Sequence, residues 1–135
     1  MTLPVTALTA AICAIMLLLT AISTVRNRLK TSRAYGDGGH AGIVSASRSH
    51  GNLAEHAPLF VIMIALLEMA RASHWPLTGL AVLFLAARTA HIIGLYQRGE
   101  EGPPPLARQA GVIGTWLSYA AAIIWILWLI VTVNA

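Results

Sequence analysis

The chain has 135 residues, of which 57% are hydrophobic and only 10% charged, and its net charge is +4. A soluble domain of this length cannot bury so much apolar surface, so the composition excludes a soluble enzyme and indicates a membrane protein. The basic residues stand beside apolar runs, which is typical of the cytoplasmic side of a membrane protein rather than a nucleic-acid-binding surface. Cys13 is the only cysteine, so no internal disulfide can form.

The first apolar segment, residues 3–25, carries no charge. As a helix it would span about 34 Å, enough to cross the hydrocarbon core. No basic residue precedes it and it is longer than the apolar part of a signal peptide, so we expect a retained helix. The following polar stretch RNRLKTSRAYGDGGHAG is predicted to be a loop.

Three more apolar segments follow and are predicted to be helices over about 44–70, 76–96 and 107–133. GEEGPPP (99–105) cannot continue a helix and is expected to be the last loop. The connections leave no room for a soluble domain. The sequence therefore predicts one domain over residues 1–135, an all-α transmembrane bundle of four helices.

Basic residues suggest how the bundle is oriented. They concentrate in the first loop and flank the third: Arg26, Arg28, Lys30, Arg33, Arg48, Arg98 and Arg108. The second loop offers only Arg71. The positive-inside rule places loops one and three in the cytoplasm and both termini across the membrane.

Charged and polar residues interrupt the second and third helices. At spacings of four and three, Arg48, Asn52 and Glu55 share one helix face. On the third helix, Arg88 and His91 lie three residues apart on one face, and Arg88 is expected at a depth similar to that of Glu55, counted from the same side of the membrane. Charged residues inside a membrane are usually functional. This cationic excess around one carboxylate indicates a site for a ligand with both signs of charge, whereas a purely structural Arg88–Glu55 ion pair is the alternative.

Two further patterns bear on binding and packing. His50 and His56 are six residues apart and face different ways, and no third ligand accompanies them, so no metal site is expected. Gly114, Ser118 and Ala122 form a stripe of small residues on the fourth helix. Such a stripe favours close helix packing and permits contacts within an oligomer.

Nearly the whole chain resembles the MAPEG family, the membrane-associated proteins in eicosanoid and glutathione metabolism, in their short bacterial branch. The resemblance rests on four segments: YGDGG (35–39), RSHGNLAEHAPLF (48–60), LLE (66–68) and ARTAHIIGL (87–95). It implies a four-helix bundle that assembles as a homotrimer, with glutathione as cosubstrate bound between subunits.

The resemblance also implies roles for single residues. The residues matching glutathione-binding positions are Arg26, Arg48, His50, Asn52, Glu55, Arg88 and His91. Arg108 matches the arginine that stabilises the glutathione thiolate. The chain departs from the eicosanoid-forming members at His56, Leu95 and Gln109, which argues against their particular activities.

The expected function is therefore that of a glutathione-dependent transferase or peroxidase in a bacterial inner membrane. Its acceptor would be a small apolar electrophile or a lipid hydroperoxide arriving from the membrane lipids. Because the family includes a member that binds lipid without catalysis, a non-catalytic lipid- or ligand-binding protein of the same fold is the alternative.

Overall fold

The computed structural model describes residues 2–97 and 102–133, which form four long helices. They are α1 (Pro4–Lys30), α2 (Ala41–Met69), α3 (His74–Gln97) and α4 (Leu106–Val133). All four are long and apolar enough to cross a membrane. The predicted four-helix, all-α architecture is therefore confirmed.

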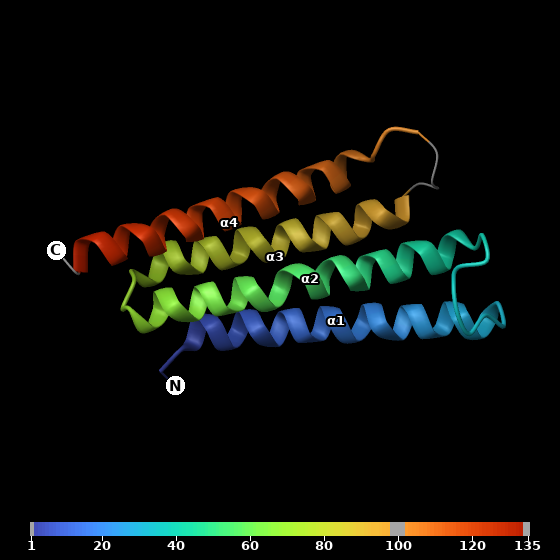
Figure 1. Ribbon diagram of the computed structural model, residues 1–135, viewed down its shortest axis with the longest axis horizontal. Coiled ribbons are helices and arrows are strands. Elements are labelled where there is room, and N and C mark those ends of the chain that lie inside the picture. The colour runs from blue at the N-terminus through green and yellow to red at the C-terminus, as the bar shows by residue number, and fades with distance from the viewer. Residues whose placement is uncertain (1, 98–101, 134–135) are drawn as a thin grey trace.

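The helices run alternately up and down, and each lies beside the next one in the chain (Figure 1). The α1–α2 connection, the end of α3 and the start of α4 share one end of the bundle (Figure 1). The start of α1, the α2–α3 turn and the end of α4 lie at the opposite end (Figure 1). Residues 98–101 lie outside the described residues. They include Arg98, one of the basic residues used to predict the orientation, and the first part of the predicted last loop.

The centre of the bundle is an aromatic contact between α2 and α3. Phe60 and Phe84 are fully buried and stack with their ring centroids 3.8 Å apart. The ring of Tyr119 on α4 packs edge-on against both. Large apolar side chains point outward elsewhere, such as Leu18 on α1 and Trp116 on α4, as helices in contact with lipid require.

The first helix is longer than predicted. It continues through RNRLK to Lys30, whereas the sequence pattern ended it at residue 25 and assigned RNRLK to a loop. Arginine, leucine and lysine are good helix formers. The positive charges of Arg28 and Lys30 in the last turn also interact favourably with the negative end of the helix dipole and stabilise this end of the helix. The end of the apolar run marks the limit of the hydrocarbon and not the limit of the helix. Similarly, α2 begins at Ala41 rather than near residue 44.

The YGDGG segment (35–39) reverses the chain between α1 and α2. Gly36, Gly38 and Gly39 have φ angles of 65°, 57° and 76°, a region that residues with a β-carbon avoid. Arg28 Nη1 donates to the carbonyl oxygens of Ala34 and Gly36 at 3.1 and 3.0 Å. The glycines of this segment therefore have a conformational role.

Glycines also let α3 and α4 approach closely. A β-carbon on Gly111 would lie 2.6 Å from the backbone nitrogen of His91, and one on Gly94 would collide with the backbone of Arg108. Neither position leaves room for a side chain. This contact places Arg108 at the start of α4 next to the last turns of α3.

The small-residue stripe of α4 packs inside the chain. A β-carbon on Gly114 would lie 2.8 Å from the β-carbon of Ala87 on α3, and Ser118 and Ala122 are fully buried. Close helix packing by the stripe is therefore confirmed. Its expected availability for contacts between subunits is wrong, because its residues are already buried within the chain.

Glu68 ties α2 to the start of α1. Its carboxylate accepts hydrogen bonds from the backbone N–H of Val5 at 2.9 Å and of Thr6 at 2.8 Å, and from the Thr6 hydroxyl at 2.7 Å. The residue before the helix, Leu3, provides no side-chain cap. Glu68 thus satisfies free N–H groups of α1 and places a negative charge at its positive end.

Candidate functional site

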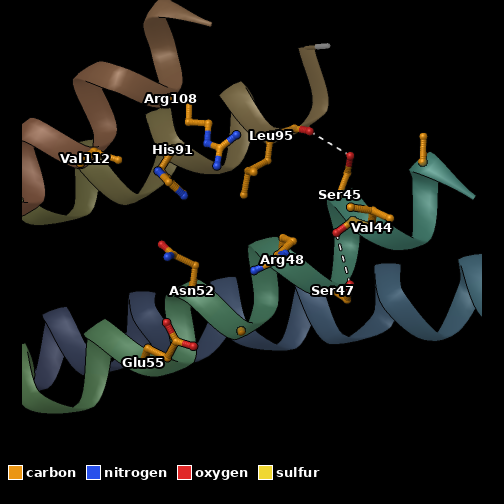
Figure 2. A pocket seen from close by; sticks show the side chains of 12 residues that line it. Val44, Ser45, Ser47, Arg48, Asn52, Glu55, His91, Leu95, Arg108 and Val112 are labelled. Atoms are coloured by element: carbon orange, nitrogen blue, oxygen red, sulfur yellow. Dashed lines mark hydrogen bonds between the residues drawn. The ribbon is translucent and has the colours of Figure 1, made fainter. Parts of the chain in front are cut away.

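A cavity of about 810 Å³ lies among α2, α3 and α4. It is located near the start of α2, the last turns of α3 and the first turns of α4, at the end of the bundle that carries the α1–α2 connection (Figures 1 and 2). Pockets for small molecules usually measure about 300–1,000 Å³, so a ligand of tripeptide size fits this volume.

One wall of the cavity is the polar stripe of α2. Arg48, Asn52 and Glu55 all line it, as their spacing predicts (Figure 2). Arg48 and Glu55 are exposed, and Asn52 is half-buried. Among the described residues, Glu55 has no hydrogen bond or ion pair. Its carboxylate is therefore available to a ligand.

The opposite wall comes from α3 and α4. His91 and Arg108 face the cavity across from Arg48 and Asn52 (Figure 2). The His91 side chain is only 6% exposed, and its Nδ1 has no hydrogen-bond partner. The close contacts of Gly94 and Gly111 with these two residues fix their positions.

Arg88 lies behind this cavity and is only 2% exposed. Its Nη1 donates to Oδ1 of Asn52 at 2.6 Å, while its Nε has no partner. A buried guanidinium without a carboxylate is costly. Its positive charge therefore favours an anionic group in the adjoining cavity.

The structural alternative of an Arg88–Glu55 ion pair is wrong, since the guanidinium bonds to Asn52 instead. The depths of the three residues in the bundle account for this partner. Counted from Ala41, Asn52 lies about 17 Å along the helix and Glu55 about 21 Å, at about 1.5 Å per residue. Arg88 lies about 14 Å from the end of α3 by the same rise, which brings it closer in depth to Asn52.

Besides Arg88, two more predicted site residues do not line the cavity of their own chain. His50 points to α1, where its Nδ1 lies 3.2 Å from the Thr20 hydroxyl. Arg26 is exposed and lines a separate groove of about 260 Å³ on α1, together with Lys30. A role for either residue in this cavity requires a second copy of the chain, so both assignments stay predictions.

The structure adds cavity residues that the sequence argument did not single out. Ser45 and Ser47 line the cavity, and the Ser45 hydroxyl donates to the carbonyl of Leu95 at 2.9 Å, which ties α2 to α3 (Figure 2). Ser45 stands three residues before Arg48, so the same helical spacing could have identified it. Val112 on α4 has no comparable signal in the sequence.

The charges of this cavity suit a particular kind of ligand. Arg48 and Arg108 supply two exposed guanidiniums, and Glu55 supplies one carboxylate. Guanidiniums bind carboxylates through paired hydrogen bonds, and a carboxylate binds an ammonium. In the parts of the chain that the structure describes, no three His, Cys, Asp or Glu side chains gather as a metal site requires. The arrangement matches a zwitterion with more than one anionic group.

Comparison with known proteins identifies relatives along the length of the chain. Residues 6–128 match the model of the MAPEG family. The chain is 32% identical over 124 residues to Inner membrane protein YecN of Escherichia coli strain K12, covering 92% of this chain and 91% of that protein. The YecN protein of Escherichia coli O6:H1 matches to the same extent. No solved structure matches the chain significantly. The family match covers most of each of the four helices and every residue that lines the cavity, and the chain therefore belongs to the MAPEG family.

Proposed function

We propose that this protein is a glutathione-dependent transferase or peroxidase that acts on apolar electrophiles or lipid hydroperoxides. One observation carries the proposal. A single cavity brings together Arg48, Asn52, Glu55, His91 and Arg108, with both signs of charge and no ion pair among these side chains. Glutathione has two carboxylates, one ammonium and one thiol, and therefore complements this set of groups.

The binding roles follow from charge. Arg48 would bind a carboxylate, and Glu55 would bind the ammonium. The buried Arg88, with its unpartnered Nε, adds positive charge behind Asn52 and favours the net negative ligand. The partly apolar lining, which includes Leu95 and Val112, is compatible with an acceptor that arrives from lipid.

Arg108 is the residue we propose for the chemical step. Glutathione supplies a thiol, and a free thiol with a pKa near 8.5 is mostly protonated at neutral pH. Arg108 lies in the first turn of α4, where the guanidinium and the positive end of the helix dipole both favour an anion. Stabilising the thiolate in this way increases the fraction of the nucleophilic form.

We further propose a homotrimer in which ligand sites form between subunits. Within one chain, Arg26 lies away from the cavity, so it can reach a ligand only in a neighbouring copy. Native mass spectrometry in detergent should give a trimer. Only monomers or dimers would contradict the assembly.

We place the protein in the inner membrane, as the name of the similar YecN proteins states for them. The basic residues of α1 and its loop, with Arg108, gather at the cavity end of the bundle, whereas Arg71 lies at the other end. The positive-inside rule then puts the cavity end and both adjoining connections in the cytoplasm, where glutathione is available.

Turnover tests the catalytic proposal. Purified protein in detergent should conjugate glutathione to an aryl halide or reduce a fatty-acid hydroperoxide, and an Arg108→Ala variant should lose most of this activity. Glutathione binding without turnover of either acceptor class would contradict catalysis and support the non-catalytic ligand-binding alternative.

A further inference from the structure

A proline weakens the part of α2 that carries two cavity residues. Pro58 lies inside this helix, three residues after Glu55. Proline has no N–H, so the carbonyl of Ala54 lacks the donor that an ordinary helix provides, and an unpaired carbonyl is costly in a membrane. The helix nevertheless continues from Ala41 to Met69. Contacts from other helices are therefore needed to hold this turn.

Side-chain hydrogen bonds meet at this turn from two directions. The Tyr119 hydroxyl on α4 donates to the carbonyl of His56 at 2.6 Å. His56 Nδ1 lies 2.8 Å from the carbonyl oxygen of Asn52, and because a carbonyl only accepts, Nδ1 carries the proton. The Asn52 side chain accepts from Arg88 on α3 at 2.6 Å. The turn from Asn52 to His56 is thus tied to α3 through Arg88 and to α4 through Tyr119.

The ring of Tyr119 is itself held in place. Its centroid lies 5.8 Å from that of Phe60, 6.3 Å from that of Phe84 and 6.1 Å from that of His56, each in an edge-on arrangement. A ring packed on these sides cannot easily move its hydroxyl. The hydrogen bond therefore restrains α2 against α4.

We propose that Tyr119 is a positioning residue for the glutathione site, an inference that rests on the proposed function. Its hydroxyl acts through the carbonyl of His56 and keeps the turn before Pro58 in the register that points Asn52 and Glu55 into the cavity. Tyr119 is not among the residues that line the cavity, so it acts on the ligand only through α2.

The test compares two tyrosine variants. Tyr119→Phe keeps the packed ring and removes the hydroxyl. Tyr96→Phe is the matched control, because the Tyr96 hydroxyl also bonds across helices, to the Ser23 hydroxyl on α1 at 3.0 Å, and among the described residues it has no hydrogen bond to α2. In calorimetric titration, Tyr119→Phe should weaken glutathione binding about three- to tenfold, the effect of losing one uncharged hydrogen bond. Tyr96→Phe should stay within about twofold of the wild type on the same scale.

A second measurement does not depend on the ligand. Hydrogen–deuterium exchange of the unliganded protein should be faster over residues 52–62 in Tyr119→Phe than in Tyr96→Phe and the wild type. Unchanged exchange in this segment would overturn the tie between Tyr119 and α2.

The outcomes separate the two proposals. Wild-type glutathione binding that Tyr119→Phe leaves unchanged would overturn the positioning role, even if both variants lose similar thermal stability. Absence of binding by the wild type would overturn the proposed function instead, together with the glutathione role of Tyr119, and the exchange data would still decide whether Tyr119 restrains α2.

Discussion

Glu68 and Glu55 allow stability and binding to be separated with one type of substitution. The two carboxylates lie on the same helix, but Glu68 accepts three hydrogen bonds from the start of α1, and Glu55 accepts none among the described residues. Replacing each with glutamine removes the charge and keeps the shape. We expect Glu68→Gln to destabilise the fold and Glu55→Gln to weaken ligand binding.

The magnitude for Glu68 follows from its bonds. A neutral acceptor in place of a charged one loses about 1 kcal/mol for each hydrogen bond, and the amide nitrogen leaves one N–H group of α1 without an acceptor at a cost of about 1–3 kcal/mol. The Glu68 side chain is only half-buried, so water replaces part of the loss. A destabilisation of about 2–3 kcal/mol is therefore expected.

Reversible unfolding in mixed detergent micelles measures this difference, and calorimetric titration of glutathione measures binding. Glu55→Gln should unfold within about 0.5 kcal/mol of the wild type and bind glutathione about ten- to a hundredfold more weakly. Glu68→Gln should instead unfold with about 2–3 kcal/mol less stability and keep the glutathione affinity of the wild type. The reasoning is refuted if Glu68→Gln is as stable as the wild type, or if Glu55→Gln loses stability and keeps its affinity.

Three other substitutions test single contacts. Arg48→Ala should weaken glutathione binding about ten- to a hundredfold by titration while circular dichroism stays unchanged, and an equal loss of helical signal would contradict a binding role. Arg108→Ala should change glutathione affinity only a few-fold but abolish the ultraviolet band of the bound thiolate; a persistent band would leave Arg108 as a membrane anchor. Gly94→Ala should destabilise the fold by about 1–3 kcal/mol in detergent unfolding, because the new β-carbon meets the backbone of Arg108. Its control, Gly79→Ala in the same helix, has open space around it and should be neutral or stabilising.

The helix layout and most of the cavity could be predicted from the sequence. A membrane requires spanning segments to satisfy their backbone groups internally, so four long apolar runs leave little choice of architecture. The spacing of Arg48, Asn52 and Glu55 also determines that they share a face, whatever the neighbouring helices do. Both inferences depend on local geometry alone.

Contacts between helices were harder to predict from the sequence. Whether Arg88 meets Asn52 or Glu55 depends on the axial register and rotation of α2 and α3, which no local sequence pattern determines. The bond between Glu68 and Thr6 joins residues 62 positions apart, and no local pattern indicates it. The length of α1 was underestimated because hydropathy reports the thickness of the membrane, while helix propensity extends the helix beyond it.

The central claim is that the cavity among α2, α3 and α4 binds glutathione. Calorimetric titration of glutathione into the purified wild-type protein in detergent tests it most directly. The proposed function predicts saturable binding that is lost when the γ-glutamyl ammonium is acetylated, because Glu55 then has no cationic partner. Absence of saturable binding at millimolar glutathione, or equal binding of the acetylated form, would contradict the claim.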